Sequence, residues 1–509
     1  WVGDTAGAAV DTVSGWAEDT KDAARELWEA AASTDFEWKD GVITVETDLD
    51  QVMDLVPADL RAGLALDRNA ADNRVAVRLD TNTHELIITS DALEIASYES
   101  ESLSTGAVSL SGMRVVLSNH SGGLPFLGGD FSMLGFQEKD DNLAAQVTVA
   151  SAIARDVQWR GEGGPLSVQS LTLTALTGTL SSGKALPGAE AASTDFGFDI
   201  EGAVLQGLKS EGHMAESVSV SGASVGMSQA GESAFLEADQ VDVRNGALGT
   251  ESLGSASASG VRVDVDNRGG GALFMDNKAD KAKARVAVEA ASISDFDGTS
   301  TDLASGSIAG ARASYDTTTG AGDAFAHDIQ MGGLDSSWVD VNTLDLDDAS
   351  VKYGRSDAGS SVEMSARRAK TDGLAIDTPT KPEGPQQPGA PLDWSANFGA
   401  VDMTDTQAAG AGIESVTARG LRASGHADGL TSTYGAHADE AAITGLSHDL
   451  IRADGLSGTN TSLTGDAHSV GIGADHIKGS GISANNVALG EVDGWGLDAS
   501  VGQGAGALS

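Results

Sequence analysis

The sequence predicts an all-β protein, an elongated repeat array of antiparallel strands preceded by a short N-terminal amphipathic helix. Three observations support this prediction. From about residue 36, apolar residues alternate with polar ones, as in strands that bury one face. The alternation breaks repeatedly at a Gly, Asp or Asn residue. Long and short intervals between these breaks alternate, as expected for an off-centre feature in successive antiparallel strands.

Composition limits the classes of function. The chain has 509 residues, with 75 Asp+Glu against 31 Lys+Arg, 65 Gly and no Cys. A formal charge of −44 repels phosphate backbones, so we expect no nucleic-acid partner. Without Cys there can be no disulfide, thiolate metal site or cysteine nucleophile. The dispersed acidic charge is explained by solubility, or by attraction of a basic protein partner.

Residues 1–35 form the predicted N-terminal helix, because small or apolar residues recur in steps of three, four or seven from Ala6 to Ala31. Its polar face is acidic, whereas helices that lie on membranes favour Lys and Arg. We therefore expect it to pack on another chain or on a segment missing from the sequence. The sequence begins with Trp1 and no signal-peptide pattern follows, so we expect the start to be processed or cropped from something longer.

Residues 36–376 form the predicted β-repeat body, with one short helix around residues 50–61. Between Val108 and Val115, the apolar positions are even up to Gly112 and odd after it. Such a change of parity requires one extra residue in the strand, a β-bulge. Gly, Asn and Asp tolerate positive φ best, so we predict a left-handed residue at each break. The predicted pivots are Gly112, Asp156, Gly202, Gly222, Asn245, Gly260, Gly310, Gly333, Asp348, Gly373, Asp405, Gly420, Gly445 and Gly455.

The spacing of the pivots separates two architectures. Steps of 23 and 15 residues alternate, for example at positions 222, 245 and 260. This favours an antiparallel meander, although a two-face β-solenoid with coils of about 40 residues could give the same pattern. A meander that runs from about residue 75 to 497 exceeds the roughly ten strands of an open sheet. We therefore expect the sheet to curl.

Residues 377–393 form a predicted linker or loop, because five prolines stand there at intervals of three. Polyproline II has three residues per turn, which would align all five prolines along one edge. A spacer or rim loop is favoured over a ligand for an aromatic groove. Residues 394–509 are the predicted continuation of the β-repeat.

Motifs of catalysis are incomplete, so we predict that the protein is not an enzyme and uses no cofactor. Residues 178–185 nearly spell a phosphate loop, but Ala185 replaces the hydroxyl that would hold magnesium. Residues 222–226 spell a nucleophile elbow inside a repeat strand. A glycan-cleaving enzyme with paired carboxylates is a third alternative, because Asp is abundant. Five histidines near the C-terminus have Asp neighbours but lack zinc spacing: His426, His437, His448, His468 and His476.

The alternation around Gly112, repeated around Gly222, Gly260, Gly333 and Gly420, resembles the repeating strands of the AsmA and TamB families of bacterial envelope proteins. The resemblance implies a long antiparallel sheet whose apolar face forms a groove for lipid acyl chains, and no catalytic residues. The residues expected to line the groove are Val108, Leu110, Met113, Val115, Val218, Val220, Val261, Val263, Met331, Leu334 and Leu421.

Two functions are therefore expected. The first is a non-enzymatic protein that binds or guides hydrophobic, lipid-like ligands along an apolar sheet face, because such a face must be covered by protein or ligand. The alternative is a structural or adhesive surface protein with a closed dry core and an acidic exterior. A cell-envelope, periplasmic or secreted location is favoured over the cytoplasm.

Overall fold

The chain is all-β throughout the part that the computed structural model describes, and no helix occurs there. The described residues are 37–48, 64–66, 73–80, 82–83, 85–100, 103–119, 142–161, 164–183, 193–228, 233–266, 282–336, 339–356, 359–376, 391–408, 410–427, 432–449, 451–466, 469–484 and 487–502. The two predicted helices, residues 1–35 and 50–61, lie outside them, as do four of the five prolines.

The chain divides into two units, each described by itself. Unit 1 comprises Trp1–Gly249 and Ser259–Ala284, and unit 2 comprises Thr250–Ala258 and Arg285–Ser509. The strands of unit 1 are β1 Glu37–Lys39, β2 Val42–Asp48, β3 Leu64–Leu66, β4 Arg74–Asp80, β5 Glu85–Glu99, β6 Leu103–Thr105, β7 Val108–Asn119, β8 Asn142–Gly161, β9 Gly164–Gly183, β10 Ser193–Ser210, β11 His213–Ser228 and β12 Ser233–Leu248.

Two strands cross the division, and the rest belong to unit 2. The crossing strands are β13 Glu251–Asp266 and β14 Lys283–Asp297. The strands of unit 2 are β15 Thr301–Asp316, β16 Ala321–Ser336, β17 Val339–Ser356, β18 Gly359–Asp372, β19 Ala375–Ile376, β20 Leu392–Ala408, β21 Ala411–Ala427, β22 Ser432–Ser447, β23 Ile451–Asp466, β24 Ser469–Ala484 and β25 Val487–Gly502.

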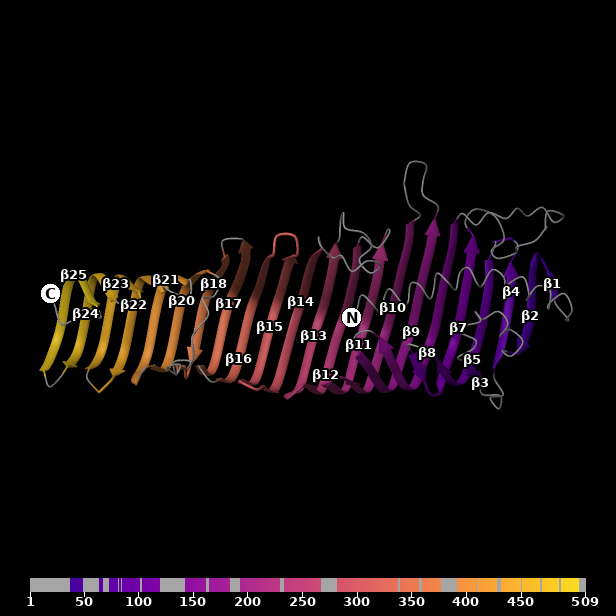
Figure 1. The fold of residues 1–509 in the computed structure, drawn as a ribbon, viewed down its shortest axis with the longest axis horizontal. Coiled ribbons are helices and arrows are strands. Elements are labelled where there is room, and N and C mark those ends of the chain that lie inside the picture. Colours follow the sequence, from indigo (N-terminus) through magenta and orange to yellow (C-terminus); the bar gives the residue numbers. More distant parts are fainter. Residues whose placement is uncertain are drawn as a thin grey trace. The chain divides into compact units, whose positions relative to one another are not determined.

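Strand pairing within each unit confirms the antiparallel array. From β7 to β12 in unit 1, and from β20 to β25 in unit 2, each strand pairs antiparallel with the next strand in the chain. Figure 1 shows β20 to β25 side by side in orange to yellow. The β-solenoid alternative is wrong for these strands, because successive coils of a solenoid would pair in parallel.

Parallel pairing interrupts the meander of unit 2 at β20, which lies beside β18 and the short β19. β18 and β20 run in parallel, with Ser360 opposite Leu392 and Asp372 opposite Thr404. Two-residue hairpins join antiparallel strands and cannot join a parallel pair. The Pro-rich region was predicted to be a linker or loop, and residues 377–390 of it lie outside the described part of the chain.

Left-handed residues recur once in each of the strands β7 to β17 and β20 to β25. Gly112, Gly222, Gly260, Gly333, Gly420 and Gly445 have φ between 56° and 62°, which is the predicted left-handed backbone. Asp156, Asn245, Asp348 and Asp405 also have positive φ, between 47° and 52°. Further residues within strands also have positive φ, although the local sequence pattern does not predict them as pivots: Ala175, Gly207, Asp295, Asn460, Gly481 and Gly496.

The predicted extra residue of a β-bulge is wrong for these strands. Pairing continues across the pivots without a shift of register, as Ile200 opposite Ala223 and Gly202 opposite Ser221 show on either side of Gly222. In both strands of a pair, the apolar side chains change parity at the same paired position. Neither strand therefore contains an extra, unpaired residue. The sheet thereby keeps one apolar face across every pivot.

The pivots form two rows that run across the strands. In unit 2, row A contains Gly310, Asp348, Gly420, Asn460 and Gly496, and row B contains Gly333, Gly373, Asp405, Gly445 and Gly481. Antiparallel neighbours take their left-handed residue from opposite rows. Each strand nevertheless crosses both rows, and its apolar positions change parity at each crossing. In β21 the apolar positions are odd at Ile413, even at Val416 and Ala418, and odd again at Leu421.

Two predicted pivots are wrong for the same reason. Gly202 lacks positive φ, and β10 instead carries its pivot at Gly207. Gly455 lacks it too, and β23 carries its pivot at Asn460. Because the rows alternate from strand to strand, β23 between Gly445 on β22 and Gly481 on β24 must place its pivot in the other row.

Each unit has its own core. In unit 1 the buried apolar cluster joins β2, β4, β5 and β7. Its buried members are Ile43, Val75, Val77, Leu79, Leu86, Leu93, Val115 and Leu117. In unit 2 the cluster is smaller and consists mainly of alanine: Ala369, Val401, Ala418 and Ala438. Large aliphatic side chains are therefore buried in the cluster of unit 1, whereas the cluster of unit 2 buries mainly small ones.

Candidate functional site

The apolar face of unit 2 is continuous from strand to strand. Residues that pair directly across a sheet share a face, so a row can be followed through the register. Val351 of β17 pairs with Met364, Met364 with Ala396 and Ala396 with Ala423. The row continues through Ala436, Leu463, Ile472 and Ala499. Apolar side chains thus line one face from β17 to β25.

Large apolar side chains on this face remain open to solvent. In the described part of unit 2, the exposed large apolar residues other than Trp495 all occupy it. They are Val286, Tyr315, Val351, Tyr353, Met364, Ile376, Leu392, Tyr434, Ile451, Leu463, Val470, Ile472, Val487, Leu489 and Leu497. Isolated exposed apolar residues are ordinary, but a contiguous exposed patch marks an interaction surface.

A hollow in this face lies over β14 to β17. It encloses about 230 Å³, and its walls are almost wholly apolar. Val288, Ile308, Ala326 and Val351 are among its lining residues. Small alanines opposite larger aliphatic residues leave this space between neighbouring strands, which an apolar chain can fill.

Aromatic residues gather along one margin of the apolar face. Tyr315, Tyr353, Trp394 and Tyr434 lie in a single cross-strand row, separated by smaller residues. Gly425 faces the indole of Trp394, and a Cβ there would overlap the ring. Aromatic rings that cover glycine on the neighbouring strand stabilise sheets. The amphipathic rings of Tyr and Trp suit the boundary between an apolar surface and water.

The predicted lining residues of unit 1 divide between core and face. Val115 is buried within the apolar cluster, and Leu110 and Met113 pack against it. Val108 is half-buried and pairs with Ile95. On β11, Val218 pairs with Val243 and Val220 with Val241, and both are half-buried on the face.

The remaining predicted lining residues are half-buried. Val261 and Val263 lie on β13. In unit 2, Met331 pairs with Leu344 and Leu334 pairs with Val341. Leu421 pairs with Phe398 and packs against the alanine-rich cluster. The exposed residues of the long strands, such as Ile472, were missed because the prediction followed only residues beside a pivot.

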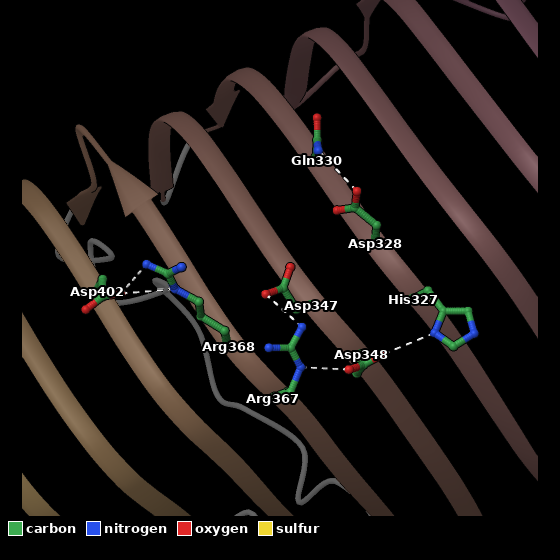
Figure 2. A network of polar contacts seen from close by, with 8 residues as sticks. All are labelled: His327, Asp328, Gln330, Asp347, Asp348, Arg367, Arg368 and Asp402. Carbon is green, nitrogen blue, oxygen red and sulfur yellow. Dashed lines mark hydrogen bonds and ion pairs between the residues drawn. The ribbon is translucent and has the colours of Figure 1, made fainter.

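The opposite face of unit 2 carries polar ladders. Figure 2 shows Asp348, the row A pivot of β17, between His327 and Arg367 of the two neighbouring strands. Arg367 donates from Nε to Asp348 at 2.8 Å, and His327 Nδ1 lies 3.1 Å from the other oxygen. These hydrogen bonds, from Arg367 first and His327 second, lower the pKa of Asp348 below its ordinary value of 3.8.

Side chains directly opposite a pivot cover it in several strands. The Asp439 carboxylate lies over Gly420 and that of Asp454 lies over Gly481, so a Cβ at either glycine would overlap a carboxylate. At Asn460 the pivot instead donates from Nδ2 to Asp475 at 2.6 Å. The pivot rows therefore present carboxylates to solvent at regular strand intervals, in agreement with the acidic composition.

Histidines of unit 2 pair with aspartates on neighbouring strands. His426 Nδ1 lies 2.7 Å from Asp393, and His476 Nε2 lies 2.6 Å from Asp493. The hydrogen bond from His476 lowers the pKa of Asp493. Among the described residues, no cluster of three or more such side chains could hold a metal ion. His468 lies outside them.

Comparisons with known proteins returned no match to a family model, to a curated protein or to a solved structure. Among the described residues, no helix is long and apolar enough to cross a membrane.

Proposed function

We propose that the protein binds hydrophobic, lipid-like ligands along the apolar face of its strands and is not an enzyme. The observation that carries the proposal is the one-sided exposure of unit 2, where large apolar residues from Val286 to Leu497 share one face. Covering a half-exposed Leu, Ile or Val side chain yields on the order of 1 kcal/mol. An acyl chain that covers several such residues would gain enough to bind stably.

The physical form of the face suits an extended, flexible ligand. The apolar rows run perpendicular to the strands, and the side chains along them repeat at the strand spacing of roughly 4.8 Å. No charged residue interrupts the row from Val351 to Ala499. A ligand that makes no directed hydrogen bonds can occupy such a surface at many positions and be guided along it. This is also the arrangement implied by the resemblance to the AsmA and TamB families.

Adjacent residues on β23 provide a matched test. Leu463 lies on the apolar face, whereas the next residue, Thr464, points to the opposite face. Both side chains are exposed. We expect Leu463→Glu to weaken binding of a fluorescent fatty acid, because a carboxylate would enter the ligand's apolar contact surface. Thr464→Glu adds the same charge to the same strand and should leave binding unchanged. Equal affinities for both variants would contradict the proposal and favour a structural or adhesive role.

A further inference from the structure

A second hollow lies on the polar face of unit 2, away from the apolar surface. It encloses about 650 Å³ over the outward side of strands β18 to β24. Thr417 and Arg419 line it, and the buried Ala418 between them contributes to its floor. Ser457 and Thr459 continue the floor on β23. This volume is in the range of small-molecule sites.

The two arginines of this groove are already paired. Arg368 donates two hydrogen bonds to Asp402, at 2.7 and 3.1 Å. Arg419 lies 3.3 Å from Glu440. The two arginines therefore offer little uncompensated charge to an anion. Lys478 also lines the groove, next to Asp493, whose pKa is lowered by the hydrogen bond from His476 and by the charge of Lys478. The groove presents hydroxyl, guanidinium, ammonium and carboxylate groups. A ligand that both donates and accepts hydrogen bonds along its length matches such a lining.

An exposed aromatic ring stands at the end of the same row. Thr459 pairs with His476, and His476 pairs with Trp495. The imidazole and indole rings stack at 3.9 Å with an angle of 10° between their planes. The hydrogen bond from His476 to Asp493 holds the imidazole in place. Trp495 is 78% exposed. Among the described residues of unit 2, no other large apolar side chain is exposed on this face.

We propose that this groove binds a neutral oligosaccharide, with Trp495 as a stacking platform and the residues around Thr417 and Thr459 as hydrogen-bonding partners. Pyranose rings carry an apolar C–H face that stacks on indole, and equatorial hydroxyl groups that both donate and accept. The regular strand spacing repeats these partners along the groove, as a chain of repeating sugar units requires. The site lies on the face opposite the proposed lipid surface, so the two proposals stand separately.

The test measures binding of four neutral hexasaccharides (cellohexaose, laminarihexaose, chitohexaose and mannohexaose) to the full chain by titration calorimetry. Polygalacturonate serves as an anionic comparison. We expect saturable binding of at least one neutral hexasaccharide, weakened about tenfold or more by Trp495→Ala, since stacking contributes of that order. Thr417→Val with Thr459→Val should weaken it as well. Tyr434→Ala removes an exposed aromatic ring from the apolar face and should leave it unchanged.

Three results would overturn the proposal. The first is no binding of any neutral hexasaccharide up to millimolar concentration. The second is binding that persists in Trp495→Ala or in the double threonine variant, when circular dichroism shows that the variant is folded. The third is binding of polygalacturonate alone that is lost on addition of salt, because charge rather than stacking would then be responsible.

Fatty-acid binding is the control for the apolar face. Its affinity in Trp495→Ala should equal that of the unmodified chain.

Discussion

Replacing a pivot glycine should destabilise the sheet by an amount that backbone geometry sets. Gly420 has φ of 58°, and a Cβ there would overlap the Asp439 carboxylate. Left-handed backbone costs a residue with a Cβ about 1–2 kcal/mol. The overlap adds less, because the end of a flexible side chain can move. We therefore expect Gly420→Ala to lower the free energy of unfolding by about 2 kcal/mol, and Gly420→Val to lower it further because β-branching restricts the backbone.

A nearby glycine serves as the matched control. Gly435 on β22 has no positive φ, and a Cβ there would make ordinary contacts of 3.8 and 4.0 Å. Gly435→Ala should therefore be neutral or stabilising by up to about 1 kcal/mol. Gly420→Asn should cost less than Gly420→Ala, because Asn tolerates this backbone and Asn460 bonds a facing carboxylate in the same row.

Hydrogen exchange of the amides of β21 and β22 is the suitable assay, since it reports local opening in an array whose strands contact mainly their neighbours. Urea unfolding gives the corresponding midpoint. Equal effects of Gly420→Ala and Gly435→Ala would refute the reasoning, because the two sites differ in backbone conformation and in the space for a Cβ.

Three further predictions concern single side chains. Leu93 is 4% exposed in the unit 1 cluster, so Leu93→Ala should cost about 2–5 kcal/mol in urea unfolding; a cost near zero would mean that the cluster is loosely packed. Burial alone raises the pKa of Asp80, but hydrogen bonds from the Asn82 and Thr83 amides and from Arg78 hold the pKa below 3.8. A carboxylate with a lowered pKa stabilises the fold at pH values above 3.8, and this contribution is lost as pH falls through the lowered pKa. Asp80→Asn should therefore reduce the acid sensitivity of the β4–β5 turn. An unchanged dependence of unfolding on pH would contradict this. Arg367→Gln should raise the pKa of Asp348 towards 3.8 in a carboxyl NMR titration, and an unchanged value would show that the ladder in Figure 2 does not form in solution.

Sequence alone was sufficient for the strands and for many pivots, for a physical reason. Gly, Asn and Asp adopt left-handed backbone most readily, so pivots such as Gly222 or Asp348 can be recognised in the local sequence pattern. Ala175 cannot be recognised in this way, and its positive φ was not predicted. Gly202 was predicted as a pivot because it fits the local pattern, but the row to which a strand contributes its pivot is decided by its neighbours.

The second change of parity was missed because it requires no special residue. Glu414 stands opposite the pivots Asp405 and Gly445 on the two neighbouring strands, and nothing in its own segment distinguishes it. The same limit applies to the candidate sites. The exposure of Ile472 and the stacking of His476 on Trp495 depend on pairs that only the register brings together. Local alternation indicated which residues are apolar, but not which of them remain uncovered.

The most direct measurement for the central claim is native mass spectrometry of the purified chain, followed by solvent extraction and lipid analysis of whatever accompanies it. An open apolar face predicts phospholipid or fatty acid in stoichiometric amount, and release of that ligand by Leu463→Glu but not by Thr464→Glu. A ligand-free mass, together with no uptake of added fatty acid, would contradict the account and show that the apolar face is covered by protein.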